Sequence, residues 1–90
     1  SYGFKWEFHI YEGDNPKDLT DLTVKLNVYD RNGNLVLSKT CTVTDTVNGI
    51  VQCSIDDNDF SETGIFKGEL ELSGTGYLER GEYFKIYVLP

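Results

Sequence analysis

The chain has 90 residues, a formal net charge of −7, 39% hydrophobic residues and 13% aromatic residues. This length supports one domain with a modest core, and the apolar content argues against disorder. The acidic balance and the eight scattered Lys and Arg argue against partners such as nucleic acid or an anionic membrane. No apolar run approaches the ~20 residues of a membrane-spanning helix.

Apolar side chains recur at every second position, which is the period of a β-strand. The predicted strands cover about 4–11, 21–30, 35–43, 49–55, 66–72 and 77–89. The segments between them are polar and contain Gly, Pro, Asn or Asp, as turns and loops do. The pattern predicts an all-β fold, a single immunoglobulin-like antiparallel β-sandwich of six to eight strands that spans residues 1–90. The chain does not begin with Met, and we expect it to be part of a longer polypeptide.

Four positions carry finer predictions. Gly33 follows Asp30 in a hairpin signal, because glycine adopts the positive φ that such turns need. Lys39 falls on the apolar face of its strand and predicts a bulge or break near 38–40, or a lysine at the sheet margin. Gly81 interrupts the last segment and predicts a bulge there, and Phe60 is expected to point from its polar loop toward the core.

The two cysteines are predicted to face each other. A turn centred near Val47 places Cys41 opposite Cys53 on the apolar face of two antiparallel strands. They can form a cross-strand disulfide or remain two buried thiols. Thiols are favoured, because bridges between directly paired strands are strained and two cysteines are too few for a disulfide scaffold. The sequence leaves this choice open.

The acidic loop over 56–62 raises the question of a bound cation, because calcium is held by several oxygens of one loop. The glycine and the final glutamate of the calcium-loop template are missing, which favours a solvated turn with side-chain to backbone hydrogen bonds. His9, the single histidine, falls on the polar side of its strand without a partner nucleophile. We therefore expect no catalytic residues, no cofactor and no metal site.

Four tyrosines are the candidate binding residues. They fall on the outward phase of their strands and are Tyr11, Tyr29, Tyr83 and Tyr87. Tyrosine is enriched at protein interfaces, because it offers a large contact area at low entropy cost. An outward tyrosine is equally explained by ordinary cross-strand packing, and the sequence does not separate the two interpretations.

The order of several short motifs resembles a known family over about residues 6–89. The motifs are Gly13-Asp14, Asp18-Leu19-Thr20, Val24-Lys25-Leu26, the hairpin from Asp30 to Gly33, Gly49-Ile50-Val51, Asp59-Phe60-Ser61, and the segment Gly68-Glu69-Leu70-Glu71-Leu72. Together they are similar to the immunoglobulin-like N-terminal domain of tailed-phage baseplate upper proteins. The resemblance rests on the combined order, because each motif alone consists of turn residues and strand apolars.

The resemblance implies a non-enzymatic structural domain of a phage virion. Such domains attach a receptor-binding or fibre assembly to the baseplate, usually in symmetric copies. It further implies synthesis in the host cytoplasm, a place in the tail or baseplate, and other virion proteins as partners, with a symmetric homo-oligomer in the assembled parent. The alternative is an immunoglobulin-like capsid decoration or surface adhesion domain that binds protein or glycan.

Overall fold

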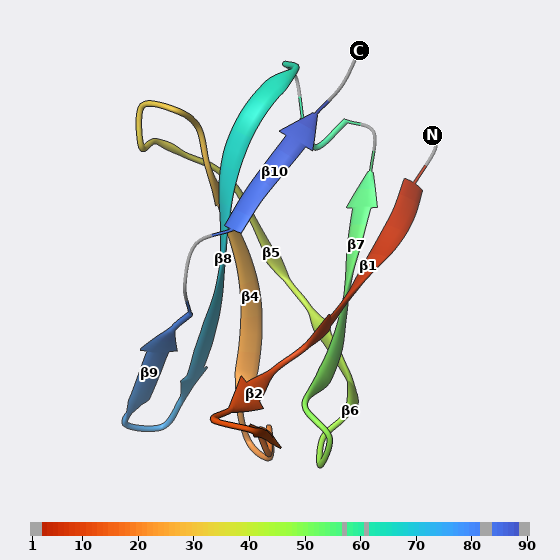
Figure 1. The fold of residues 1–90 in the computed structure, drawn as a ribbon, viewed down its shortest axis with the longest axis vertical. Coiled ribbons are helices and arrows are strands. Elements are labelled where there is room, and N and C mark those ends of the chain that lie inside the picture. The colour runs from red at the N-terminus through yellow and green to blue at the C-terminus, as the bar shows by residue number, and fades with distance from the viewer. Residues whose placement is uncertain (1–2, 57, 61, 82–83, 89–90) are drawn as a thin grey trace.

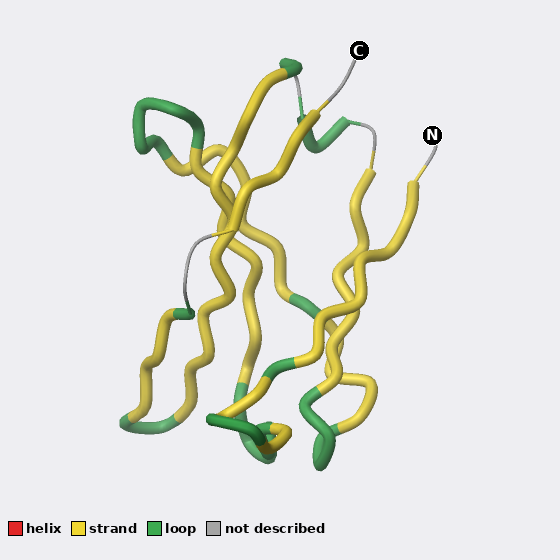
Figure 2. The backbone as a smooth tube through the Cα atoms, viewed as in Figure 1, coloured by secondary structure: helices red, strands yellow, loops and turns green. Residues whose placement is uncertain are grey.

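The computed structural model describes residues 3–56, 58–60, 62–81 and 84–88. All regular structure in this part of the chain is β-strand (Figure 2). None of it is a helix long and apolar enough to cross a membrane. The all-β prediction is therefore confirmed.

Two antiparallel sheets face each other (Figure 1). The smaller has the strand order β1-β7-β6 and the larger the order β10-β8-β4-β5, with β9 also paired to β8. The strands are β1 (Gly3–His9), β2 (Tyr11–Glu12), β3 (Asn15–Pro16), β4 (Thr23–Tyr29), β5 (Leu35–Thr40), β6 (Thr42–Asp45), β7 (Ile50–Asp56), β8 (Gly64–Gly74), β9 (Tyr77–Arg80) and β10 (Phe84–Val88). The start of β1 and the end of β10 lie at the same end of the sandwich, the upper end in Figure 1.

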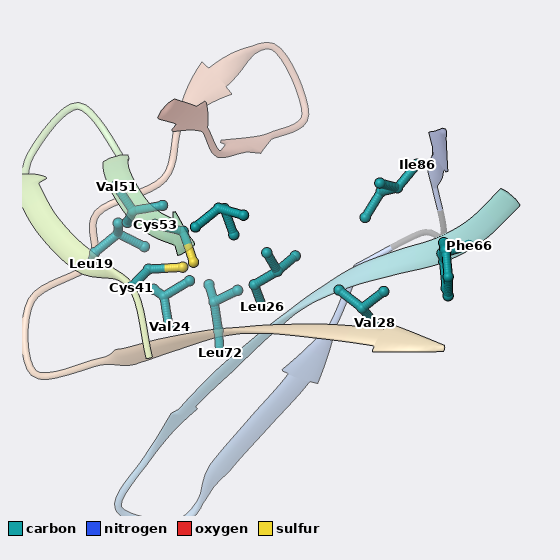
Figure 3. Close-up of a cluster of buried hydrophobic side chains, with 11 residues drawn as sticks. Leu19, Val24, Leu26, Val28, Cys41, Val51, Cys53, Phe66, Leu72 and Ile86 are labelled. Atoms are coloured by element: carbon teal, nitrogen blue, oxygen red, sulfur yellow. The ribbon is translucent and has the colours of Figure 1, made fainter. Parts of the chain in front are cut away.

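The core fills the space between the sheets. Its members alternate along the central strands, because every second side chain of a strand points to the same face. They are Leu19, Val24, Leu26, Val28, Cys41, Val51, Cys53, Ile55, Phe66, Leu72 and Ile86 (Figure 3). Phe60 packs against this core with its ring 5.3 Å from that of Phe66, as the sequence predicted.

Two glycines have a positive φ in turns, and at one of them a side chain would also clash with the backbone. Gly33 has φ +85° in the hairpin between β4 and β5, which confirms the predicted turn. Gly49 has φ +69° just before β7. A Cβ there would lie 2.5 Å from the carbonyl oxygen of Ile10 and 2.7 Å from that of Lys17. Ile10 N also donates to Gly49 O at 2.8 Å, so three segments meet closely at this glycine.

The segment around Lys39 departs from a simple continuous strand. β5 ends at Thr40 and β6 begins at Thr42, so the chain passes from the larger sheet to the smaller at Cys41. The break falls just beyond the predicted 38–40. Lys39 itself lies on β5, the edge strand of the larger sheet, which is the predicted alternative of a lysine at the sheet margin. A register shift in the pairing of β4 with β5 lies at Val28 and Tyr29.

The predicted loop between the first two predicted strands is more ordered than expected. Tyr11 pairs with Pro16 and Glu12 with Asn15, so β2 and β3 form a minimal hairpin. Its turn contains Gly13 with φ +64°. Gly and Pro correctly indicated a turn, but they gave no signal of the pairing on both sides of it.

The last segment is divided near Gly81. β9 and β10 both pair with the same edge of β8. Arg80 pairs with Glu71 and Phe84 pairs with Gly68, so the last segment advances four residues while β8 advances three. One extra residue on the last segment is the register change that a β-bulge produces. Residues 82 and 83 themselves lie outside the described part of the chain. Gly81 N donates to Leu70 O at 3.0 Å at the start of the change.

Candidate interaction surfaces

The structure separates the four predicted tyrosines. Tyr11 is 59% exposed at the start of β2, and Tyr87 is 60% exposed on β10. Tyr29 is half-buried on β4. Tyr83 lies outside the described residues. The tyrosines therefore do not form one cluster: Tyr11 belongs to β2, which lies toward the lower end of the molecule in Figure 1, and Tyr87 belongs to β10, which lies in its upper half.

Tyr29 is part of a polar network on the outer face of the larger sheet. Its hydroxyl donates to Glu69 Oε1 at 3.1 Å, and Asn27 Nδ2 lies 3.5 Å from the same oxygen. Arg80 Nε lies 3.8 Å from it, and 3.3 Å from Glu71 Oε1. Glu69 is only 2% exposed although it points away from the core. This arrangement supports the packing interpretation of Tyr29, because its hydroxyl already stabilises a buried carboxylate.

Asn27 completes the network toward β5. It accepts a hydrogen bond from Ser38 Oγ at 2.8 Å and donates to Glu71 Oε1 at 3.2 Å. The sequence analysis missed this network. The strand register is the feature that would have predicted the network, because Asn27 stands directly opposite Glu69 on β8 and opposite Ser38 on β5. Two facing polar residues in the middle of a sheet indicate hydrogen bonding, but the pairing of β4 with β8 was not known from the sequence.

Tyr87 lies in a more apolar neighbourhood. Its cross-strand partner on β8 is Ile65, which is 53% exposed. Leu35, beside Tyr29 at the start of β5, is also exposed. Scattered exposed apolar residues are normal on a protein surface. Tyr87 and Ile65 are directly paired, so together they form a continuous exposed apolar surface at the β10 edge.

Tyr11 lines a groove of about 420 Å³ between β1 and the edge of the larger sheet. The apolar wall comes from Phe8 and Phe84, whose ring centroids lie 5.7 Å apart, and from Leu70 and Leu72. Lys17 and Glu79 contribute charge, with their side chains 3.9 Å apart. The hydrogen bond with Tyr77 raises the pKa of Lys17 above its usual value, so Lys17 is cationic at neutral pH. The sequence analysis did not predict this groove, because it depends on which strands form the edges.

The acidic loop is held by a lysine. Lys39 Nζ lies 2.9 Å from Asp59 Oδ2, and Asp56 N donates to the same oxygen at 2.8 Å. Burial raises the pKa of Asp59, whereas the hydrogen bonds from Asp56 N and Lys39 lower it. Together the hydrogen bonds and the charge of Lys39 outweigh burial, so the pKa of Asp59 is below its usual value. Among the residues described, no group of three or more His, Cys, Asp or Glu could hold a metal ion.

Cys41 and Cys53 are adjacent free thiols in the core, with their sulfur atoms side by side in Figure 3. The hydrogen bond with Cys53 and burial raise the pKa of Cys41, so this thiol stays protonated at neutral pH. Val43 faces Val51 in the pairing of β6 with β7, as the predicted register requires. The favoured interpretation of two buried thiols agrees with the structure.

His9 is exposed, and its Nε2 donates to Glu7 Oε2 at 2.8 Å. This hydrogen bond lowers the pKa of Glu7. Both side chains belong to β1 and point outward from the sheet. Among its described contacts, this pair has no nucleophile within hydrogen-bond reach.

The class of the chain follows from these observations: it is an antiparallel β-sandwich whose distinctive surfaces are exposed strands and their side chains. A scan against protein-family models matches the BppU N-terminal domain over residues 5–79. The chain therefore belongs to this family, the N-terminal domain of the phage baseplate upper protein, and is a structural baseplate domain. The resemblance seen in the motifs is confirmed. No curated protein matches the chain.

Proposed function

We propose that the chain is a non-enzymatic attachment domain that joins a receptor-binding or fibre assembly to the baseplate of a phage tail. The observation that carries this proposal is the family match over residues 5–79, which runs from β1 into β9 and leaves β10 outside. The partners would be other virion proteins, with the domain present in symmetric copies.

The strand order supports an immunoglobulin-like architecture for this role. In immunoglobulin sandwiches one sheet contains the order B-E-D and the other the order G-F-C, extended in variable domains by C′. The orders β1-β7-β6 and β10-β8-β4-β5 correspond to these, with β5 as the added strand. Because the two sheets share one core, we infer that residues 1–90 act as a single domain.

The contact residues we propose are Tyr11 and Tyr87, which are both exposed. Tyr29 would act by positioning, because its hydroxyl is bound to Glu69. Tyr83, the fourth predicted contact residue, lies outside the described part of the chain. Since Tyr11 and Tyr87 lie at different ends of the sandwich, they would contact different neighbours, or different parts of one large neighbour.

The proposal is tested by locating the chain in virions with gold-labelled antibodies and electron microscopy. Label at the end of the tail is expected. Label on the capsid would instead support a decoration domain, and virions without label would refute both.

The contact residues are tested in a second experiment. Tyr11→Ala and Tyr87→Ala are expected to reduce co-purification with the baseplate proteins while leaving the melting temperature nearly unchanged. Leu78→Ala is the matched control, because Leu78 is equally exposed, at 61%, on β9. Equal co-purification of all three variants would rule out the two tyrosines as contact residues.

A further inference from the structure

β1 is an edge strand with an unused side. It pairs with β7 over its whole length, from Gly3 opposite Asp56 to His9 opposite Ile50. The other side of β1 is paired to no strand among the described residues. A seven-residue edge strand is a template for pairing with another strand, because its backbone donors and acceptors alternate between its two sides.

The inner face of β1 is incompletely covered. Trp6 stands opposite Cys53 and Phe8 opposite Val51 on β7, and both β7 residues are fully buried. Trp6 and Phe8 are only half-buried, and Phe8 lines the groove described above. Apolar side chains therefore continue up to the open edge, where a further strand would cover them.

The outer face of β1 carries charges that β7 does not match. Lys5 and Glu7 are exposed and stand opposite the uncharged residues Ser54 and Gln52, and the charged partner that Glu7 has on its own strand is the exposed His9. Because cross-strand partners of opposite charge stabilise a sheet, an added strand that presents a carboxylate to Lys5 and a cation to Glu7 would fit this edge.

We propose that this strand is the β1 of a second copy of the chain, paired antiparallel to the first across a twofold axis at Trp6. In this register Lys5 of each copy faces Glu7 of the other, and the two Trp6 residues face each other. The result is one continuous sheet of the order β6-β7-β1-β1-β7-β6. A twofold contact of this kind is self-complementary, so a single favourable pair of positions occurs twice.

The register is selected by face and by charge. A shift of one residue would place the apolar face of one strand beside the polar face of the other. A shift of two residues in one direction would set Lys5 against Lys5, and in the other direction Glu7 against Glu7. The register centred on Trp6 avoids both like-charge contacts and also pairs all seven residues of the strand.

This inference goes beyond the attachment role, because it concerns contact between copies and not contact with the rest of the baseplate. The two can fail separately: the antibody experiment locates the chain in the virion, whereas self-association is measured on the purified chain alone.

Sedimentation equilibrium of the 90-residue chain, from micromolar to millimolar concentration, tests the proposal. We expect a reversible monomer–dimer equilibrium. Lys5→Glu and Glu7→Lys should each weaken the dimer by about tenfold or more, since each creates two like-charge contacts by symmetry. An equimolar mixture of the two variants should dimerise again, because each strand then faces the opposite charge. The double variant Lys5→Glu/Glu7→Lys should dimerise like the wild type.

Lys85→Glu is the matched control, because Lys85 is an exposed lysine like Lys5 but lies on β10 of the other sheet. It should leave dimerisation unchanged. A wild-type chain that remains monomeric throughout overturns the proposal, as does a dimer that both single variants preserve. Failure of the mixture to recover dimerisation overturns the register. Circular dichroism spectra of each variant confirm that the fold is retained.

Discussion

The neighbouring strands β1 and β7 have the same length and the same alternation, yet they differ in depth. In β7 the inward side chains of Val51, Cys53 and Ile55 are almost completely buried. In β1 the inward Trp6 and Phe8 remain half-buried, although they are larger. Among the described strands, β7 has a partner on each side and β1 has a partner on one side, which accounts for the difference. Alternation therefore identifies a strand, and its position in the sheet decides how much it stabilises the fold.

The largest contrast is expected between the cores of the two strands. Ile55→Ala should lower the free energy of unfolding by about 3 kcal/mol, because it leaves a cavity in a closed core. Phe8→Ala should cost about 1–2 kcal/mol, because part of the ring is already in water. Urea unfolding followed by fluorescence measures both values. Equal losses for the two variants would contradict the idea that the open edge makes β1 the weaker contributor.

The junction of the two strands is tested at Gly49, whose carbonyl accepts the hydrogen bond from Ile10 N. Gly49→Ala should cost about 2–4 kcal/mol, because a positive φ is combined with a backbone clash. Gly33→Ala is the control, since its φ is also positive but nothing lies within 4 Å of its added Cβ. It should cost about 1 kcal/mol. If thermal unfolding shows the same loss of stability for both variants, the clash at Gly49 does not contribute to the free energy of unfolding.

The interior of β7 is probed by changing polarity at nearly constant volume. Cys53→Ser should lower stability by about 1–2 kcal/mol, because it introduces a hydroxyl into an apolar core. Cys53→Ala should cost less than Cys53→Ser, and comparison of the two isolates the polar effect. Both native thiols should react slowly with iodoacetamide until the protein unfolds. Fast labelling of the folded protein would show that the sandwich opens at β7.

The smallest effect is expected beyond the end of β7, where Asp59 accepts hydrogen bonds from Asp56 N and Lys39. Because the pKa of Asp59 is lowered in the folded protein, its carboxylate stabilises the fold above about pH 4. This contribution is lost as the pH falls through the lowered pKa. Asp59→Asn should cost about 1 kcal/mol at pH 7 and less at acidic pH.

The pH dependence of Asp59 is read from melting temperatures at neutral and acidic pH. Asp14→Asn serves as the control, because it removes the same charge at an exposed turn. A difference between wild type and Asp59→Asn that grows toward acidic pH would contradict the assigned role of the carboxylate.

Much of the fold was predictable from local pattern. The strands followed from period-two alternation, and the turns at Gly33 and Gly49 followed from their glycines. The facing of Cys41 and Cys53 followed from the turn position alone. The passage between sheets at Cys41 was harder to predict from the sequence, because the chain continues in an extended form on both sides. Only the tertiary fold shows that the chain pairs with β4 before Cys41 and with β7 after it.

The candidate surface was predictable only in part. Exposure of Tyr11 and Tyr87 followed from their strand phase. Tyr29 has the same phase but is half-buried, because its strand β4 lies in the centre of the sheet and Glu69 on β8 accepts its hydroxyl. The free side of β1 could not be predicted, since an edge is a property of strand order and not of the strand's own sequence.

The common position of the start of β1 and the end of β10 has a mechanical consequence. The two strands belong to different sheets, and the start of β1 and the end of β10 lie at the same end of the sandwich. Tension applied between these two strand ends therefore pulls the sheets apart across the core. The hydrogen bonds between β10 and β8 would then break one after another, starting at the end of β10. In strands that are pulled parallel to their own length, such bonds break all together. The domain on its own should yield at low force, and any load that the assembly bears is better carried by contacts along its sides.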